Sequence, residues 1–365
     1  MPATILLASL DRVRTLAVPL LLALALNGCS SLDYYGQLAS GQLQLLHARE
    51  PVARVLADPS RDATLRQRLA LSQRARVFAS AELALPDNGS YRVYADIHRP
   101  FVVWNVFATP ELSLAPVTHC FPIAGCVAYR GYYQPGRARG AAALMREEGL
   151  DTWIGGVEAY STLGWFDDPI LSSMVRWDED RLAAVIFHEL AHQQLYVADD
   201  SAFNESFASF VEREGLRQWR ASQGLPAGGE EGVRQREQFT ALVLASRERL
   251  ERLYASDRPD AEKRAAKQAE FERLRRDYRQ LRDSQWQGVG RYDGWIESPL
   301  NNAKLLPFGL YDRWVPAFAE LYRRSAGWTD FYERVAALAA LEPMQRQAAV
   351  AALMPENSPV AASVE

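Results

Sequence analysis

The sequence is poor in the residues that most often bind metals or form disulfides: its 365 residues include only 5 histidines and 3 cysteines. It also lacks an excess of charge of either sign, because 41 Lys and Arg residues stand against 45 Asp and Glu residues. The resulting net charge of -4 gives no indication of a nucleic-acid partner. We find no internal repeat. The length, with 48% hydrophobic residues, fits one large globular domain or two small ones.

Long hydrophobic runs are also missing, apart from residues 15–26. This run is too short for a comfortable membrane span, and it ends in Leu26-Asn-Gly-Cys29, which resembles the lipobox of bacterial lipoproteins. The resemblance implies that residues 1–28 are a signal peptide and that lipid on Cys29 anchors the protein in a membrane. Ser30 stands where an aspartate would retain a lipoprotein in the inner membrane, which favours the outer membrane and a periplasm-facing protein. An uncleaved signal anchor is the alternative.

The other two cysteines are Cys120 and Cys126. In an oxidising periplasm the simplest expectation is a disulfide that closes the short loop between them. A metal site is the alternative, but His119 is the only nearby histidine.

Two of the five histidines lie four residues apart in His188-Glu-Leu-Ala-His192. On an α-helix this spacing places both imidazoles on one face. The apolar flanks, without proline or glycine, predict such a helix, and Asp178 or Asp180 can cap it. In this H-E-x-x-H arrangement two neutral imidazoles bind Zn²⁺, and Glu189 acts as the general base. The alternative is a structural hydrogen bond between His188 and Glu189.

A third protein ligand is expected from Glu205, on a second helix that begins near Ser201. Only twelve residues separate His192 from Glu205, so a tight turn around Val197–Asp200 has to join the two helices. Three protein ligands leave an open position for water, which is the mark of a catalytic zinc site.

This site resembles that of the gluzincins, zinc metallopeptidases with an H-E-x-x-H helix and a glutamate ligand on a following helix. More of the chain resembles a bacterial family of predicted aminopeptidases that are lipoproteins. The matching segments are residues 125–133, 155–165, 188–192, 204–205 and 301–303. The resemblance implies a zincin-like α+β fold, a zinc cofactor and peptide substrates.

The segment Gly155-Gly-Val-Glu-Ala159 resembles the Gly-x-Met-Glu-Asn edge strand of gluzincin aminopeptidases. In those enzymes the glutamate binds the α-ammonium group of the substrate, and Glu158 is at the matching position. Val157 and Ala159 depart from the pattern. A carboxylate near the metal would select a free amino terminus, and peptide binding to an exposed sheet edge is a common mode of recognition. The alternative is an exposed strand glutamate.

Two supporting roles follow from the same resemblance. Some relatives carry an aspartate four positions after the glutamate ligand, where this chain has Ser209, so another carboxylate has to orient a zinc histidine. The candidates are Asp199, Asp200 and Glu212. An oxyanion-stabilising tyrosine is expected from the carboxy-terminal half, and Tyr311 is our choice. Its competitors are Tyr254 and Tyr292.

We expect the mature chain to be α+β, with a small mixed sheet and a mostly helical carboxy-terminal half. The segments are a signal peptide (1–28), a tether and helices (29–86), a zincin-like catalytic core (87–222), a charged helical hairpin (223–290), a helical part completing the cleft (291–354) and a disordered tail (355–365). Within the core, β-type patterns predict strands at 91–97, 101–108, 127–133 and 152–163, with a turn at 98–100.

These features together predict a lipid-anchored zinc metallopeptidase of the bacterial cell envelope, and more specifically an aminopeptidase acting on peptides. One alternative is a zinc endopeptidase acting on envelope proteins. The other is a non-enzymatic envelope lipoprotein, in which the hairpin binds a partner and the metal only stabilises the fold. The sequence does not specify the side-chain preference or the oligomeric state.

Overall fold

The computed structural model describes residues 32–355 except 122–124, 160–161, 163–165, 227–229 and 309–312. Cys29, Tyr311 and residues 356–365 of the expected tail therefore lie outside the described residues. The chain divides into two compact units, Met1–Ala48 and Arg49–Glu365. In the first unit the described residues form a helix over residues 32–47. The features below belong to the second unit.

The fold is α+β, and its strands form small separate sheets in place of the single mixed sheet that we expected. The strands are β1 (Arg49–Pro51), β2 (Val93–Ala95), β3 (Val103–Pro110), β4 (His119–Phe121), β5 (Gly125–Val127), β6 (Tyr129–Tyr132), β7 (Leu150–Val157) and β8 (Ile170–Leu171). The sheet orders are β1-β2-β8, β6-β3-β7 and β4-β5. Only the first is mixed, with β1 antiparallel and β8 parallel to β2. The bend at 98–100 therefore joins strands of different sheets.

Helices make up most of the remaining described chain. They are α2 (Val52–Ala57), α3 (Ala63–Ala81), α4 (Pro135–Glu147), α5 (Glu179–Gln194), α6 (Ser201–Ser222), α7 (Glu230–Ala255), α8 (Asp260–Gln285), α9 (Asp293–Glu297), α10 (Asn302–Leu305), α11 (Val315–Arg323), α12 (Trp328–Ala339) and α13 (Pro343–Ala351). Within the described part of the chain, no helix combines the length and the apolar character needed to cross a membrane.

Helices α5 and α6 begin at side-chain caps. The Asp178 carboxylate, one of the two caps that the sequence allowed, accepts the Arg181 backbone N–H at the start of α5. The Asp200 carboxylate accepts the Phe203 N–H at the start of α6. Gly215 lets α6 pack closely against α5 and the end of α3, because a Cβ atom there would lie 3.1 Å from the Phe187 ring and 2.7 Å from the Leu83 side chain. The apolar face of α5 is thereby buried, which fixes the helix that carries both histidines.

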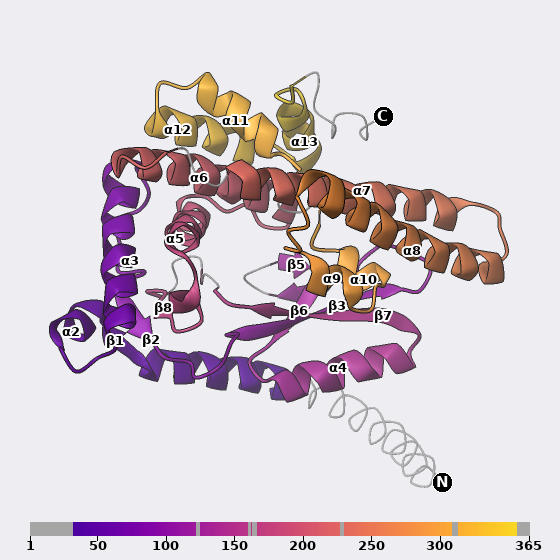
Figure 1. Ribbon diagram of the computed structural model, residues 1–365, viewed down its shortest axis with the longest axis horizontal. Helices are drawn as coiled ribbons and strands as arrows, with labels where there is room; N and C mark the ends of the chain where they lie inside the picture. Colours follow the sequence, from indigo (N-terminus) through magenta and orange to yellow (C-terminus); the bar gives the residue numbers. More distant parts are fainter. Residues whose placement is uncertain are drawn as a thin grey trace, which may run out of the picture. The chain divides into compact units, whose positions relative to one another are not determined.

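The sheet β6-β3-β7 is antiparallel, with α4 and α10 on opposite faces (Figure 1). Strand β7 is at one edge of this sheet and ends at Val157, earlier than expected, so Glu158 follows the strand. Its two glycines make room for aromatic rings and not for another backbone. A Cβ at Gly155 would lie 2.8 Å from the Trp153 ring, and one at Gly156 would lie 2.5 Å from the Phe101 ring.

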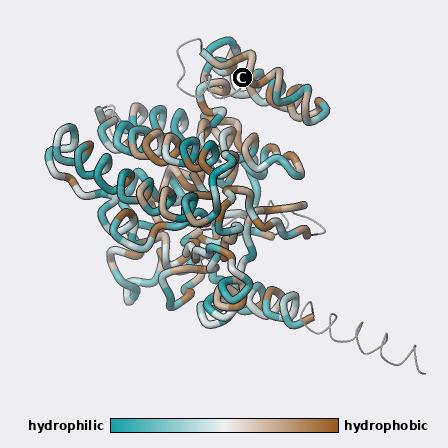
Figure 2. Tube along the Cα trace, turned by 90° about the vertical axis from the view of Figure 1, so that its right-hand side faces the viewer, coloured by the Kyte–Doolittle hydropathy of each residue, from teal (hydrophilic) through white to brown (hydrophobic). Residues whose placement is uncertain are grey.

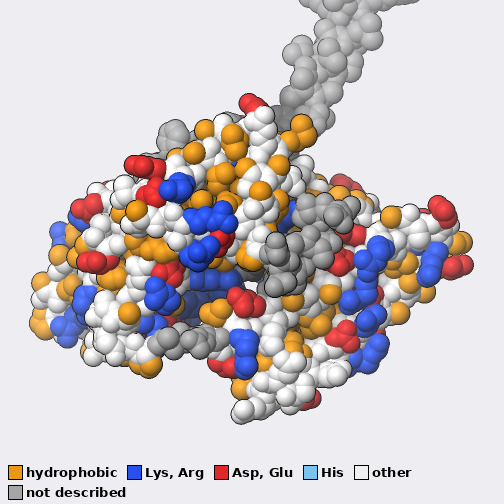
Figure 3. Space-filling view, turned by 90° about the horizontal axis from the view of Figure 1, so that it is seen from above, with side chains coloured by type: hydrophobic (Ala, Val, Ile, Leu, Met, Phe, Trp, Pro, Cys, Tyr) orange, Lys and Arg blue, Asp and Glu red, His pale blue; other side chains and the backbone are white. Residues whose placement is uncertain are grey.

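The expected helical hairpin is formed by α7 and α8, which lie side by side (Figure 1). The buried residues at its core include Leu250, Phe271, Leu274 and Tyr278. Hydrophilic residues predominate on the rest of both helices (Figure 2). Side chains of both charges are interspersed along this arm of the molecule (Figure 3). The charged residues therefore form a solvated face.

A buried polar contact ties the hairpin to the start of β7. The Lys267 ammonium lies 2.6 Å from the Asp151 carboxylate, which also accepts the backbone N–H of Asn302. The Asn302 side-chain oxygen in turn accepts the Tyr254 hydroxyl at 2.8 Å. Asn301 caps α10 and donates its amide to the Thr152 carbonyl of β7. The two asparagines thus hold the hairpin, α10 and the edge strand together.

Candidate metal centre

Three side chains from α5 and α6 bring potential ligand atoms to one point. Nε2 of His188 and Nε2 of His192 are 3.2 Å apart. Oε2 of Glu205 lies 3.5 Å from Nε2 of His188 and 3.7 Å from Nε2 of His192. Both imidazoles are buried, whereas 24% of the Glu205 side chain is exposed. Solvent therefore reaches this cluster from the Glu205 side.

The spacing of these atoms fits a single metal ion. A tetrahedral metal with bonds of about 2.0–2.1 Å sets its ligand atoms about 3.3–3.4 Å apart, close to the observed separations of 3.2, 3.5 and 3.7 Å. Two imidazole nitrogens and a carboxylate oxygen at this spacing need either a cation or shared protons between their lone pairs. In the described part of the chain, this is the one group of at least three His, Cys, Asp or Glu side chains able to hold a metal.

One of the three predicted supporting carboxylates orients a histidine. Oε2 of Glu212, on α6, lies 3.0 Å from Nδ1 of His188, so the other ring nitrogen faces the ligand point. Arg236 of α7 lies 3.9 Å from the other oxygen of Glu212, which links the hairpin to this contact. Nδ1 of His192 is buried and has no hydrogen-bond partner among the described residues. The support of the two ligands is therefore asymmetric.

The protonation states of His188 and Glu205 depend on burial and on the contacts between the histidines and the carboxylates. Burial alone would lower the pKa of His188, but the Glu205 and Glu212 carboxylates raise it well above its usual value. Burial would raise the pKa of Glu205, but hydrogen bonds with His188 and His192 lower it to about 2. In the metal-free protein, the cluster therefore holds a proton on His188 beside an ionised Glu205.

Glu189 is the carboxylate next to the cluster that is free to take a proton. No group in the described part of the chain hydrogen-bonds it. Burial raises its pKa above the usual glutamate value, and the nearby histidines oppose this rise only in part. A carboxylate with a raised pKa is a stronger base, which suits general-base catalysis.

The connection between α5 and α6, residues 195–200, is held by an asparagine that sequence reasoning missed. The Asn204 side chain accepts the Val197 backbone N–H at 2.8 Å and donates to the Val197 carbonyl at 2.7 Å. An amide side chain can pair with both backbone groups of one residue, as a neighbouring strand would. Its position directly before Glu205 was the available signal. The clamp fixes the return of the chain from one ligand helix to the other.

The two cysteines support the same connection from outside. The sulfurs of Cys120 and Cys126 are 1.97 Å apart, a disulfide across the β4–β5 hairpin. The backbone N–H of Cys126 donates to the Asp199 carboxylate at 2.8 Å. Gly125 is needed beside it, because its φ is +70° and a Cβ there would clash with the same carboxylate. The hairpin therefore docks on the α5–α6 connection.

Glu158 is not in the metal cluster in this structure. Its carboxylate lies 2.6 Å from the guanidinium of Arg181 on α5, and that guanidinium stacks on the Trp177 ring at 4.2 Å. Arg181 precedes His188 by seven residues, which is about 10 Å along the same face of α5. The carboxylate expected to bind an ammonium group is therefore already paired with a cation.

Of the three tyrosines named from the sequence, Tyr311 lies outside the described residues, and the other two have partners in or beside the hairpin. Tyr254 is bonded to Asn302, and Tyr292 stacks on Phe239 in the hairpin core. A tyrosine not named from the sequence, Tyr196, lies beside the cluster, with its ring 6.4 Å from the His192 ring. Burial raises the pKa of Tyr196, and the Glu205 and Asp199 carboxylates raise it further. Tyr196 directly follows the helix end, and its place four residues after His192 was the signal missed.

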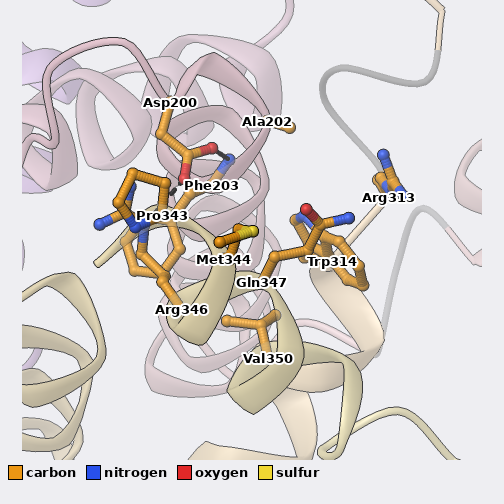
Figure 4. A pocket seen from close by; sticks show the side chains of 10 residues that line it. All are labelled: Asp200, Ala202, Phe203, Arg313, Trp314, Pro343, Met344, Arg346, Gln347 and Val350. Atoms are coloured by element: carbon orange, nitrogen blue, oxygen red, sulfur yellow. Dashed lines mark hydrogen bonds and ion pairs between the residues drawn. The ribbon is translucent and has the colours of Figure 1, made fainter. Parts of the chain in front are cut away.

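A separate cavity of about 200 Å³ lies between the first turn of α6 and α13, and none of the three ligands lines it (Figure 4). Within it, the Arg346 guanidinium binds the Asp200 carboxylate at 2.8 Å. Arg346 also donates to the Ala339 and Leu341 carbonyls. The contact supports the cap of α6, the helix that carries Glu205.

A protein-family model with the description "Putative aminopeptidase" matches residues 33–350 of the chain. The chain belongs to this family. Membership indicates a peptidase, a hydrolase that acts on peptides. No curated protein and no solved structure matches the chain.

Proposed function

We propose that this protein is a zinc-dependent metallopeptidase of the bacterial cell envelope that removes amino-terminal residues from peptides. The observation that carries the proposal is the convergence of His188, His192 and Glu205 at metal-ligand spacing, with the unpaired base Glu189 on the same helix. Two histidines and one carboxylate form a common ligand set of catalytic zinc sites.

The reaction uses this chain's residues in defined roles. Zinc held by His188, His192 and Glu205 would polarise the scissile carbonyl and lower the pKa of a bound water towards about 7. Glu189 takes the proton from the attacking water and passes it to the leaving amine. Glu212 keeps the His188 ring oriented through Nδ1 during this sequence.

The edge strand β7 offers a place for an extended peptide. The Val157 carbonyl accepts the Val102 N–H on the side of β3, whereas the Thr152 carbonyl accepts the Asn301 amide on the other side. Because strand residues alternate, the backbone groups of Ile154 and Gly156 point away from β3. A substrate added there would pair as a further antiparallel or parallel strand.

Restriction to free amino termini rests on Glu158, which follows this edge. Its carboxylate could bind the substrate's α-ammonium group after release from Arg181. The same ion pair favours the second candidate, a zinc endopeptidase, because a neutralised Glu158 gives no preference for a free amino terminus.

A panel of aminoacyl fluorogenic substrates, each compared with its N-acetylated form, tests the two candidates. An aminopeptidase cleaves only the free amines, and equal cleavage of both forms identifies an endopeptidase. Metal analysis and activity assays of the variant Glu189→Gln test the role of Glu189 as the general base. The variant should keep one zinc per chain and lose hydrolysis by at least about 10²-fold. Unchanged activity would place the base elsewhere.

The non-enzymatic alternative, a lipoprotein with a structural metal, predicts zinc in the wild-type protein and no hydrolysis of any peptide. The envelope location rests on the lipobox-like sequence before Cys29. Incorporation of labelled palmitate should occur in the wild-type chain and disappear in Cys29→Ala. Labelling that persists in this variant would contradict a lipid anchor at Cys29.

A further inference from the structure

We propose that the phenol of Tyr196 donates a hydrogen bond to the oxyanion that forms at the scissile carbonyl, a role that rests on the proposed peptidase function. Tyr196 directly follows Leu195, which ends α5 in an extended conformation. The extended residue turns the chain away from the helix axis. The Tyr196 ring nevertheless stays beside the ligand His192, with a centroid distance of 6.4 Å and an angle of 71° between the ring planes.

The phenol is available to a ligand. The Tyr196 side chain is 36% exposed, although it lies beside a buried histidine. In the described part of the chain its hydroxyl has no hydrogen-bond partner, so the donor is not used by the fold. An unused donor at the exposed margin of a buried metal-ligand cluster is placed to meet a group that binds there.

The backbone that carries Tyr196 is fixed. The next residue, Val197, is clamped through both its N–H and its carbonyl by Asn204, which is itself only 1% exposed. Two residues further, Asp199 accepts the N–H of Cys126 from the disulfide hairpin. A donor stabilises a transition state best when it is already held in position before the reaction.

The chemistry requires no proton transfer from the phenol. As the water oxygen bonds to the carbonyl carbon, the C=O π electrons move onto the carbonyl oxygen, and Glu189 takes the water proton. The Tyr196 O–H donates to this oxygen while the negative charge resides there. When the C–N bond breaks, the electrons return to re-form the carbonyl, and the leaving amine receives the proton from Glu189.

The test compares wild-type protein with Tyr196→Phe, which keeps the ring beside His192 and removes only the hydroxyl. The control is Tyr35→Phe, since Tyr35 is 46% exposed and belongs to the other compact unit. We expect Tyr196→Phe to bind zinc as the wild type does. Its kcat should fall about 10²-fold with KM within about threefold, and its affinity for a phosphinic dipeptide that mimics the tetrahedral oxyanion should fall by a similar factor. Tyr35→Phe should match the wild type in each measurement.

The two proposals fail in different ways. A kcat and a phosphinate affinity within twofold of the wild type would refute the role of Tyr196, as would a rise in KM with unchanged kcat. Loss of zinc in Tyr196→Phe would show a packing role at His192 and would also refute it. Absence of peptide hydrolysis by the wild type would refute the peptidase function. Even in that case, equal phosphinate affinities of the wild type and Tyr196→Phe would refute the role of Tyr196, because this measurement does not depend on hydrolysis.

Discussion

Oε2 of Glu212 lies 3.0 Å from Nδ1 of His188, although Glu212 follows the ligand Glu205 by seven residues, two turns of α6. We expect Glu212→Gln to weaken zinc binding by about 10–100-fold, because the ring loses the charged acceptor that orients it. Competition with a chelator of known affinity measures the change. Glu237→Gln is the control, since Glu237 is exposed and, among the described residues, forms its ion pair with Arg213. A dissociation constant equal to that of the wild type would show that Glu212 does not orient the ligand.

Metal binding should release a proton. Because the pKa of His188 is raised in the metal-free protein, this imidazole is protonated at neutral pH, and zinc requires its neutral form. Zinc affinity should therefore fall about tenfold per pH unit below the pKa of His188 in the metal-free protein. Calorimetry in buffers of different ionisation enthalpy should show about one proton released at pH 7. No dependence on the buffer would contradict a protonated His188.

The same raised pKa has the opposite effect on the metal-free fold. A histidine whose pKa is higher in the folded than in the unfolded chain adds stability that is fully present below about pH 6.5 and is lost as pH rises through the folded pKa. The free energy of unfolding of the metal-free protein should decrease over this interval. In His188→Gln the decrease should be smaller. Denaturant titrations at several pH values compare the two, and identical pH profiles would contradict the assignment.

Replacing Arg181 tests whether Glu158 binds substrate ammonium groups. Arg181→Met keeps an apolar stem over the Trp177 ring and removes the cation that pairs with Glu158. KM for substrates with a free amino terminus should fall severalfold, because the substrate no longer displaces an internal cation. KM for the N-acetylated substrates should stay the same. Arg217→Met, at an exposed arginine of α6 that pairs with Glu214, is the control. An equal change for both substrate classes would assign Arg181 a structural role.

Loss of the disulfide should act mainly on the α5–α6 connection. Cys120 and Cys126 are only six residues apart, so the chain-entropy contribution of the bridge is modest, about 2 kcal/mol. In the double variant Cys120→Ser, Cys126→Ser we expect faster amide hydrogen exchange in residues 195–200, since the β4–β5 hairpin no longer holds Asp199 firmly. Exchange measured by mass spectrometry tests this. Unchanged exchange in that segment would show that the hairpin does not order it.

The features that the sequence predicted best are those that depend on local spacing. His188 and His192 share a helix face by their four-residue interval, and the short interval to Glu205 allows only a tight return. The hairpin likewise follows from helical periodicity, because its apolar residues recur at helical spacing and Leu250, Phe271, Leu274 and Tyr278 are buried. Predictions from such patterns do not depend on which distant segments of the chain are in contact.

The features that were missed depend on tertiary contacts. The choice among Asp199, Asp200 and Glu212 is made by how α6 packs along α5, which brings Glu212 and not the nearer aspartates to His188. The strands β2 and β3 carry β-type residues, but their partners come from segments far along the chain. The pairing of Glu158 with Arg181 also joins residues 23 positions apart. Neither the spacing of residues nor the composition specifies these tertiary contacts.

The contact between Asp200 and Arg346 spans 146 residues, whereas the three candidate metal ligands lie within eighteen positions. The ligands can therefore gather as soon as α5 and α6 pair, before the distant α13 has docked. Closing so long a loop is slow and costs chain entropy, so the support of α6 at its first turn forms late. We therefore expect the candidate ligands to come together before the fold is complete. A nascent chain would then have its candidate metal site assembled while the ion pair between Asp200 and Arg346 is still missing.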